Sequence, residues 1–66
     1  MSESNDDLKL IREIVLNGGR KYTAGKIDRT RYQRLLDFGW LTPFVINASD
    51  VEYVVTDQGR AAAKSG

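Results

Sequence analysis

The stretch YQRLLDFGWL, residues 32–41, joins a helical pattern to a strand-forming one and therefore decides the fold. Its first apolar residues recur on one face of a helix: Tyr32, Leu35 and Leu36. This spacing predicts a helix over residues 29–38, with Asp28 as its N-cap. Gly39 ends the helix, because glycine accepts the left-handed conformation common at helix C-termini without a steric penalty.

Downstream of this stretch, the pattern is that of a hairpin followed by a helix. Strand-forming residues are concentrated in segment 40–48, and residues 51–55 place Val51, Tyr53 and Val55 on one face of a second strand. The turn-forming cluster 47–50 separates the two segments, so they are predicted to pair as a β-hairpin. Thr56 is placed to cap a last helix over residues 57–64, which is rich in alanine. Gly59, in the first turn of that helix, is predicted to allow close packing against the hairpin.

Upstream, apolar spacing predicts a first helix over residues 6–17. Acidic residues in its first turn support this prediction, because the positive N-terminal end of the helix dipole stabilises them. Residues 18–27 contain three glycines and are predicted to form a connector with one short helical turn. Residues 1–5 are predicted to be a disordered tail. The expected fold is thus a single α+β domain at 6–64, in the order α-α-β-β-α, with one hairpin.

Composition narrows the chemistry that the 66 residues can perform. The chain contains no cysteine and no histidine, which excludes disulfides and makes a zinc site unexpected. No recognisable pair of carboxylates is present, so we expect neither an enzyme nor a bound cofactor or metal. The apolar runs are too short to cross a membrane, and the N-terminus lacks the pattern of a signal peptide. These features predict a cytoplasmic protein.

Positive charge is concentrated in one part of the chain. The net charge is only +1, but residues 20–34 hold six cations against Asp28, a net of +5, which leaves −4 for the rest. Three interpretations compete: a phosphate-binding loop, a helix face that follows nucleic acid, and an ordinary solvated face. The first fails, because the spacing from Gly19 to Gly25 is wrong and Ile27 replaces the hydroxyl residue of a Walker A loop.

Two features favour a nucleic-acid interface. Arg29 and Arg31 fall in the first turn of the predicted second helix, where cations oppose the helix dipole by roughly 0.3–1 kcal/mol each. Thr30, Gln33 and Arg34 lie near Arg29 on the same predicted face, and these residue types contact base edges and phosphates.

Two segments resemble the winged helix-turn-helix family. Residues 32–41 are similar to a recognition helix that leads into the wing hairpin, and YVVTDQGRA, residues 53–61, resembles the pattern that closes the wing in MarR- and PadR-like regulators. The resemblance implies a minimal winged helix. It implies major-groove contacts from Arg29, Thr30, Gln33 and Arg34. It also implies phosphate contacts from Arg20, Lys21 and Lys26.

The sequence departs from that family in two places. Segment 18–27 leaves room only for a stub of the middle helix, and the wing tip at 47–50 carries an acid but no Lys or Arg. The leading hypothesis is non-catalytic binding of double-stranded DNA in transcriptional, plasmid-type or phage-type regulation. The alternative is a protein-interaction or adaptor module of the same fold, with homodimer formation through the first helix left open.

Overall fold

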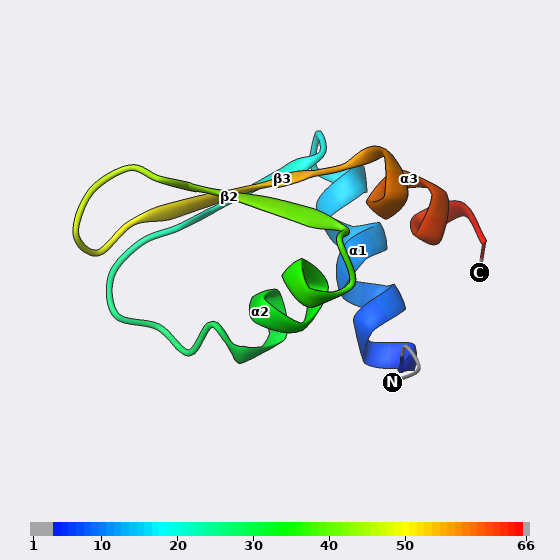
Figure 1. The fold of residues 1–66 in the computed structure, drawn as a ribbon, viewed down its shortest axis with the longest axis horizontal. Helices are drawn as coiled ribbons and strands as arrows, with labels where there is room; N and C mark the ends of the chain where they lie inside the picture. Colours follow the sequence, from blue (N-terminus) through cyan, green and yellow to red (C-terminus); the bar gives the residue numbers. More distant parts are fainter. Residues whose placement is uncertain (1–3, 66) are drawn as a thin grey trace.

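The computed structural model describes residues 4–65, which form three helices and a three-stranded antiparallel sheet (Figure 1). The elements in chain order are α1 (Asn5–Leu16), β1 (Arg20–Thr23), α2 (Thr30–Asp37), β2 (Leu41–Val45), β3 (Val51–Val55) and α3 (Asp57–Lys64). The α+β class and the β2–β3 hairpin are confirmed. The order is α-β-α-β-β-α, because a strand precedes α2.

Strand β1 replaces the helical turn that the sequence predicted in the connector, and that part of the prediction is wrong. β1 pairs antiparallel with β3, from Arg20 opposite Val54 to Thr23 opposite Val51, so β3 is the central strand. The four residues of β1 are mostly polar and exposed. Their strand conformation comes from hydrogen bonds to a distant segment, and such pairing leaves no strong periodic pattern in so short a strand.

The first helix begins one residue earlier than predicted, at Asn5, because Ser4 and Asp7 form a capping box. The Ser4 hydroxyl oxygen accepts the Asp7 backbone N–H at 3.2 Å, and the Asp7 carboxylate accepts the Ser4 N–H at 3.0 Å. Ser4 and Asn5 therefore belong to the start of α1, and residues 1–3 of the predicted tail lie outside the described residues. The helix ends at Leu16, before two glycines with positive φ.

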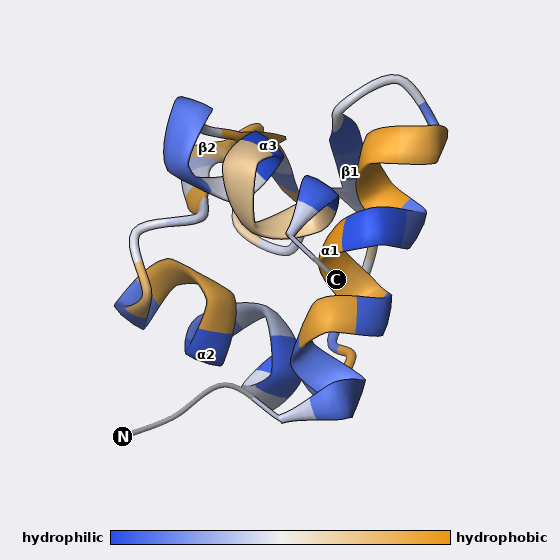
Figure 2. Cartoon of the chain, turned by 90° about the vertical axis from the view of Figure 1, so that its right-hand side faces the viewer, coloured by the Kyte–Doolittle hydropathy of each residue, from blue (hydrophilic) through white to orange (hydrophobic). Residues whose placement is uncertain are grey.

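Helices α1 and α2 lie on the same side of the sheet and α3 lies beyond its end, packed against α1 (Figure 1), and the core fills the space between the helices and the sheet. The apolar bands of α1 and α2 alternate with hydrophilic ones along each helix, as expected for amphipathic helices (Figure 2). The buried apolar residues come from all layers of the fold: Leu10, Ile11, Ile14, Leu35, Trp40, Leu41, Tyr53 and Val55. Within residues 4–65, no helix combines the length and the hydrophobicity that crossing a membrane requires.

The turn from β3 into α3 depends on Thr56 and Gly59. The Thr56 hydroxyl donates to the Gly39 carbonyl at 2.6 Å, and its oxygen accepts the Gly59 N–H at 3.0 Å. A Cβ on Gly59 would overlap the carbonyl oxygen of Trp40 and would lie 2.8 Å from Cγ1 of Val55. The predicted cap and the predicted close approach at this glycine are both confirmed.

Candidate nucleic-acid interface

Helix α2 is held to the fold through one face, and the opposite face meets solvent. Leu35 is fully buried, and the ring of Tyr32 stacks on that of Tyr53 with centroids 5.0 Å apart. The helix begins at Thr30, because the Asp28 carboxylate accepts both the Thr30 N–H at 2.9 Å and the Thr30 hydroxyl at 2.6 Å. This Asx-type contact lowers the pKa of Asp28. The N-cap itself is Arg29, which makes no side-chain capping bond, so the prediction of Asp28 as the N-cap is wrong by one residue.

The exposed residues of α2 carry hydrogen-bonding side chains: Thr30, Arg31, Gln33 and Asp37. The amide nitrogen Nε2 of Gln33 donates to Oδ1 of Asp37 at 3.2 Å, one turn further along. Both side chains are exposed, so this contact competes with water and leaves Gln33 available to a ligand. Two of the predicted base-contacting residues, Thr30 and Gln33, therefore lie where the prediction requires.

Arg29 has a different position from the one predicted, because its half-buried guanidinium holds two loops together. It donates to the hydroxyl of Thr23 at 3.2 Å and to the carbonyls of Gly25 and Ser49 at 2.9 Å each. These contacts connect the end of β1, the following loop and the β2–β3 turn. They give a structural reason for a cation at the start of α2, which the sequence interpretation had attributed to DNA binding alone.

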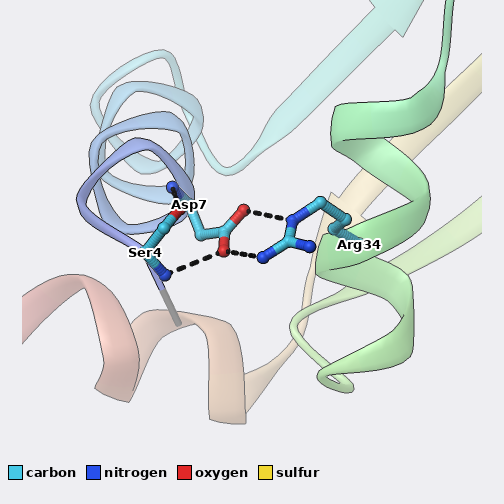
Figure 3. A network of polar contacts seen from close by, with 3 residues as sticks. All are labelled: Ser4, Asp7 and Arg34. Carbon is cyan, nitrogen blue, oxygen red and sulfur yellow. Dashed lines mark hydrogen bonds and ion pairs between the residues drawn. The ribbon is translucent and has the colours of Figure 1, made fainter. Parts of the chain in front are cut away.

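Arg34 forms a bidentate ion pair with Asp7 of α1 (Figure 3). Its Nε lies 3.0 Å from Oδ1 and its Nη2 lies 2.7 Å from Oδ2, and Asp7 is buried. The hydrogen bonds from Arg34 are the main reason that the pKa of Asp7 is far below its usual range, and they outweigh the opposing effect of burial. The same pair raises the pKa of Arg34, so this cation is committed to joining α2 and α1.

The remaining predicted residues are exposed but do not share one surface. Arg20 and Lys21 point to opposite faces of the sheet, because Arg20 is paired with Val54 and Lys21 with Tyr53. Lys26 lies in the loop before α2. The predicted contact residues thus fall into three groups. Arg20 and Lys21 lie on β1, and Lys26, Thr30 and Gln33 lie on α2 and the loop before it. Arg29 and Arg34 are bonded to other residues of the chain.

Arg31 belongs to the interface but was missing from the predicted set of contacts. It is exposed in the first turn of α2, beside Thr30. Helical spacing gives no signal for it, because Arg31 stands four residues before the buried Leu35 and so on the same side of α2. It is exposed because it lies in the first turn, and it has no carboxylate partner among the described residues. Its position makes it the side chain of α2 best placed for a phosphate.

The charge of this region remains largely uncompensated. Arg34–Asp7 is the one ion pair within residues 4–65. Segment 20–31 holds five cations (Arg20, Lys21, Lys26, Arg29 and Arg31) and one acid, Asp28, a net of +4 along the sequence, and none of the five forms an ion pair. The carboxylate of Asp50 also lies against this segment, at Tyr22 and Gly25.

The hairpin turn folds against the loop that follows β1. The carboxylate of Asp50 accepts hydrogen bonds from the Tyr22 hydroxyl, from the Gly25 N–H at 3.1 Å and from Nδ2 of Asn47 at 3.1 Å. The hydrogen bond from Tyr22 is the first cause that lowers the pKa of Asp50, and the same bond raises the pKa of Tyr22. Asp50, the acid at the predicted wing tip, therefore holds the β2–β3 turn against the loop that follows β1. No local sequence signal indicates this role.

A separate apolar groove lies between the C-terminal ends of α1 and α3. Its lining residues are Arg12, Val15, Leu16, Ala63 and Lys64. Nε of Arg12 donates to the Ala63 carbonyl at 3.2 Å across the groove. In the described part of the chain, the acidic residues form no group of three that could hold a metal ion.

Comparison with known sequences places the chain in a family. Residues 3–65 match the family described as DUF3860-like, and the chain belongs to it. No curated protein matches the chain. The family description names no activity, so the function has to be argued from the geometry of the side chains.

Proposed function

We propose that this member of the DUF3860-like family is a non-catalytic domain that binds double-stranded DNA through α2 and the loop before it. The observation that carries the proposal is a set of exposed cations without an ion-pair partner on the α2 side of the sheet, Lys21, Lys26 and Arg31, next to an exposed helix face. Clustered cations without carboxylate partners attract the phosphate backbone, and phosphate contacts supply most of the affinity of small DNA-binding domains.

Helix α2 takes the role of a recognition helix in this proposal. Arg31 and Gln33 are exposed on it, and Thr30 lies at its N-terminal end. Arg and Gln make bidentate contacts with guanine and adenine in the major groove, and Thr contacts phosphates. Gln33 is then the base-reading side chain of α2, and Arg31, which is two residues earlier and turned to another side of the helix, is placed for a phosphate. Arg34 is bonded to Asp7 and makes neither contact. Arg29 supports the site indirectly by holding the loop that carries Lys26.

The winged-helix resemblance supports the same assignment, with β2–β3 in the position of the wing. The wing turn at residues 47–50 has no Lys or Arg, and Asp50 is bonded to β1 and its loop. We therefore expect the DNA to contact α2 and the loop around Lys26, with no phosphate contact from the turn. A lone domain of this kind binds weakly and with a strong dependence on salt.

A chemical-shift titration of labelled protein with a mixed-sequence duplex, at two salt concentrations, tests the proposal. We expect shifts at residues 26–33 that weaken as salt rises. Arg31→Ala and Lys26→Ala should each weaken binding and reduce the slope of log K against log salt by about 1. Lys64→Ala is the matched control, because Lys64 is an exposed cation at the end of α3, outside the proposed interface.

Two outcomes would contradict DNA binding. One is the absence of shifts at low salt with millimolar protein and duplex. The other is an equal loss of affinity in the Lys64→Ala control, which would mean that only overall charge matters.

The groove between α1 and α3 favours a second candidate, a protein-interaction module. Leu16, which is 86% exposed, extends the apolar lining that Val15 and Ala63 give this groove, and contiguous exposed apolar surface is typical of protein-interaction sites. If this candidate is correct, Leu16→Ser alters the mass of the assembled protein, and duplex DNA leaves the spectrum unchanged. These two readouts separate it from the DNA-binding proposal.

A further inference from the structure

The sheet has one face without any covering element. Helices α1 and α2 occupy the other side, α3 lies beyond the end of the sheet, and no segment crosses the outer face in Figure 1. The strand register identifies its residues, because cross-strand partners point to the same face. We call this surface the outer sheet face, and it consists of Arg20, Tyr22, Thr42, Phe44, Glu52 and Val54.

The outer sheet face is apolar and aromatic at its centre. Tyr22 and Phe44 stand opposite Glu52 from the two flanking strands, and their side chains are 52% and 51% exposed. Val54 lies two residues along the central strand, between Arg20 and Thr42. Two half-exposed aromatic rings in one cross-strand row are costly to leave in water, because burial of apolar surface is the main driving force of association.

Nucleic acid is a poor occupant for this face, although exposed aromatic rings can stack on bases. Glu52 lies between the two rings, and the carboxylate of Asp50 is bonded to the hydroxyl of Tyr22. Two acids beside the rings repel a phosphate backbone, whereas nucleic-acid platforms combine aromatic rings with cations. A protein surface is a better match.

The charges on the outer sheet face complement a second copy of the same face. It carries one cation, Arg20, and one anion, Glu52, in neighbouring rows of the sheet. Neither has an ion-pair partner within residues 4–65. In a two-fold arrangement each contact occurs twice, so Arg20 of each copy can meet Glu52 of the other while the aromatic rings pack between them.

We propose that the outer sheet face packs against the same face of a second copy to form a two-fold symmetric dimer. Sheets pack face to face about 10 Å apart, and the pairing would cover the rings of Tyr22 and Phe44. The proposal is independent of DNA binding, since α2 lies on the other side of the sheet. In this proposal Arg20 contacts Glu52 of the second copy, so it is no longer assigned to a phosphate contact.

The size of the face sets the expected affinity. Three strands about 4.8 Å apart, with a rise of about 3.3 Å per residue, give a footprint of a few hundred Å² per copy. Stable complexes bury about 800 Å² per partner, so this dimer should be weak. We expect association at concentrations between about 10 μM and 1 mM.

Sedimentation equilibrium over that concentration range is the first test. We expect the mass to rise from 7.4 kDa toward twice that value as concentration increases. Phe44→Ser should weaken the association at least about tenfold, because a central aromatic residue contributes much of the energy of a small interface. Val45→Ser is the matched control, because Val45 is a second exposed apolar residue of β2 that lies on the opposite face of the sheet. It should leave the mass unchanged.

A charge exchange provides the sharper test and does not depend on Phe44→Ser remaining folded. Arg20→Glu places two carboxylates against each other in a pair of identical copies, and Glu52→Arg places two guanidinium groups together, so each variant alone should be monomeric. An equimolar mixture restores an attractive contact between unlike copies and should dimerise. A protein that stays at 7.4 kDa at all concentrations would overturn the proposal. So would a dimer that is lost only in Leu16→Ser, or a mixture that stays monomeric while the unmodified protein dimerises.

Discussion

Two cross-strand pairs of aliphatic residues on the inner side of the sheet differ in burial. Leu41 and Val55 face each other at one end and are almost completely buried, whereas Val45 and Val51 face each other at the other end, where Val45 is 75% exposed. The first end is covered by α1 and α3 and sealed by Gly59. The second end is held by two hydrogen bonds, one from the Arg29 guanidinium to the Ser49 carbonyl and one from the Gly25 N–H to the Asp50 carboxylate.

This difference means that the stability of the fold and the proposed DNA binding depend on opposite ends of the sheet. The apolar end contains the three fully buried side chains Ile11, Ile14 and Leu35, so most of the hydrophobic stabilisation lies within or next to it. The polar end holds loops that carry uncompensated charge, and hydrogen bonds at partly exposed positions contribute little net free energy each. A protein of this size can therefore present cations on the polar end without weakening its core.

The largest expected effect comes from closing the tight contact at the apolar end. Gly59→Ala places a Cβ against the Trp40 carbonyl and the Val55 side chain, and it should lower the free energy of unfolding by about 3 kcal/mol. Urea denaturation measures the change. Gly18→Ala is the control, because Gly18 has open space around it and only a positive φ, which costs about 1 kcal/mol. Equal effects at the two glycines would show that packing at Gly59 is unimportant.

The next largest effect concerns the ion pair that joins α2 to α1. Asp7→Asn removes the charge that accepts two hydrogen bonds from Arg34 and should lower the free energy of unfolding by about 2 kcal/mol at pH 7. The folded pKa of Asp7 is depressed, so its stabilisation is complete above the unfolded pKa of about 4 and decreases as pH falls below it. The variant should lose this part of the acid dependence.

Asp6→Asn is the control for the ion pair. Asp6 is an exposed acid in the same first turn, and its contribution through the helix dipole is about 0.3–1 kcal/mol. In Asp7→Asn, only the smaller contributions of Asp28 and Asp50 should make the free energy of unfolding fall between pH 7 and pH 3. If it falls as steeply as that of the unmodified protein, the assignment is contradicted.

A smaller and more local effect is expected at the polar end. Arg29→Met keeps the aliphatic stem but removes the bonds to Thr23, Gly25 and Ser49, and it should cost about 1 kcal/mol. Amide hydrogen exchange should accelerate at Gly25 and in the turn at residues 47–50, with little change in the core. Arg31→Met should leave these rates unchanged. Uniform acceleration throughout the protein would show that Arg29 supports the whole fold.

The smallest effect is a change of titration without a change of stability. Tyr22→Phe removes the hydroxyl that donates to Asp50, and the free energy of unfolding should stay within about 0.5 kcal/mol of the original value. The pKa of Asp50, measured from its carboxyl carbon by NMR, should rise toward its usual value. The pKa of Asp28 should not move, because Thr30 is the main cause of its lowering.

Sequence patterns were sufficient where the determining contacts are local. The helices, the hairpin, the Thr56 cap and the close packing at Gly59 follow from spacing over a few residues and from glycine chemistry. β1 was missed because its strand conformation depends on β3, and its four residues show no apolar–polar alternation in burial. The same limit applied to the site. Thr30 and Gln33 were placed correctly, whereas Arg34 pairs with a residue 27 positions away and Arg29 bonds a carbonyl 20 positions away.

The position of β3 has a consequence for how the chain acquires its fold during synthesis. β3 is the last strand in the chain and the central strand of the sheet, and β1 and β2 have no hydrogen-bonded contact with each other. A nascent chain that has reached only residue 50 therefore contains two strands that both lack their partner, and no part of the sheet can pair. Folding of the sheet therefore has to wait until residues 51–55 have been synthesised.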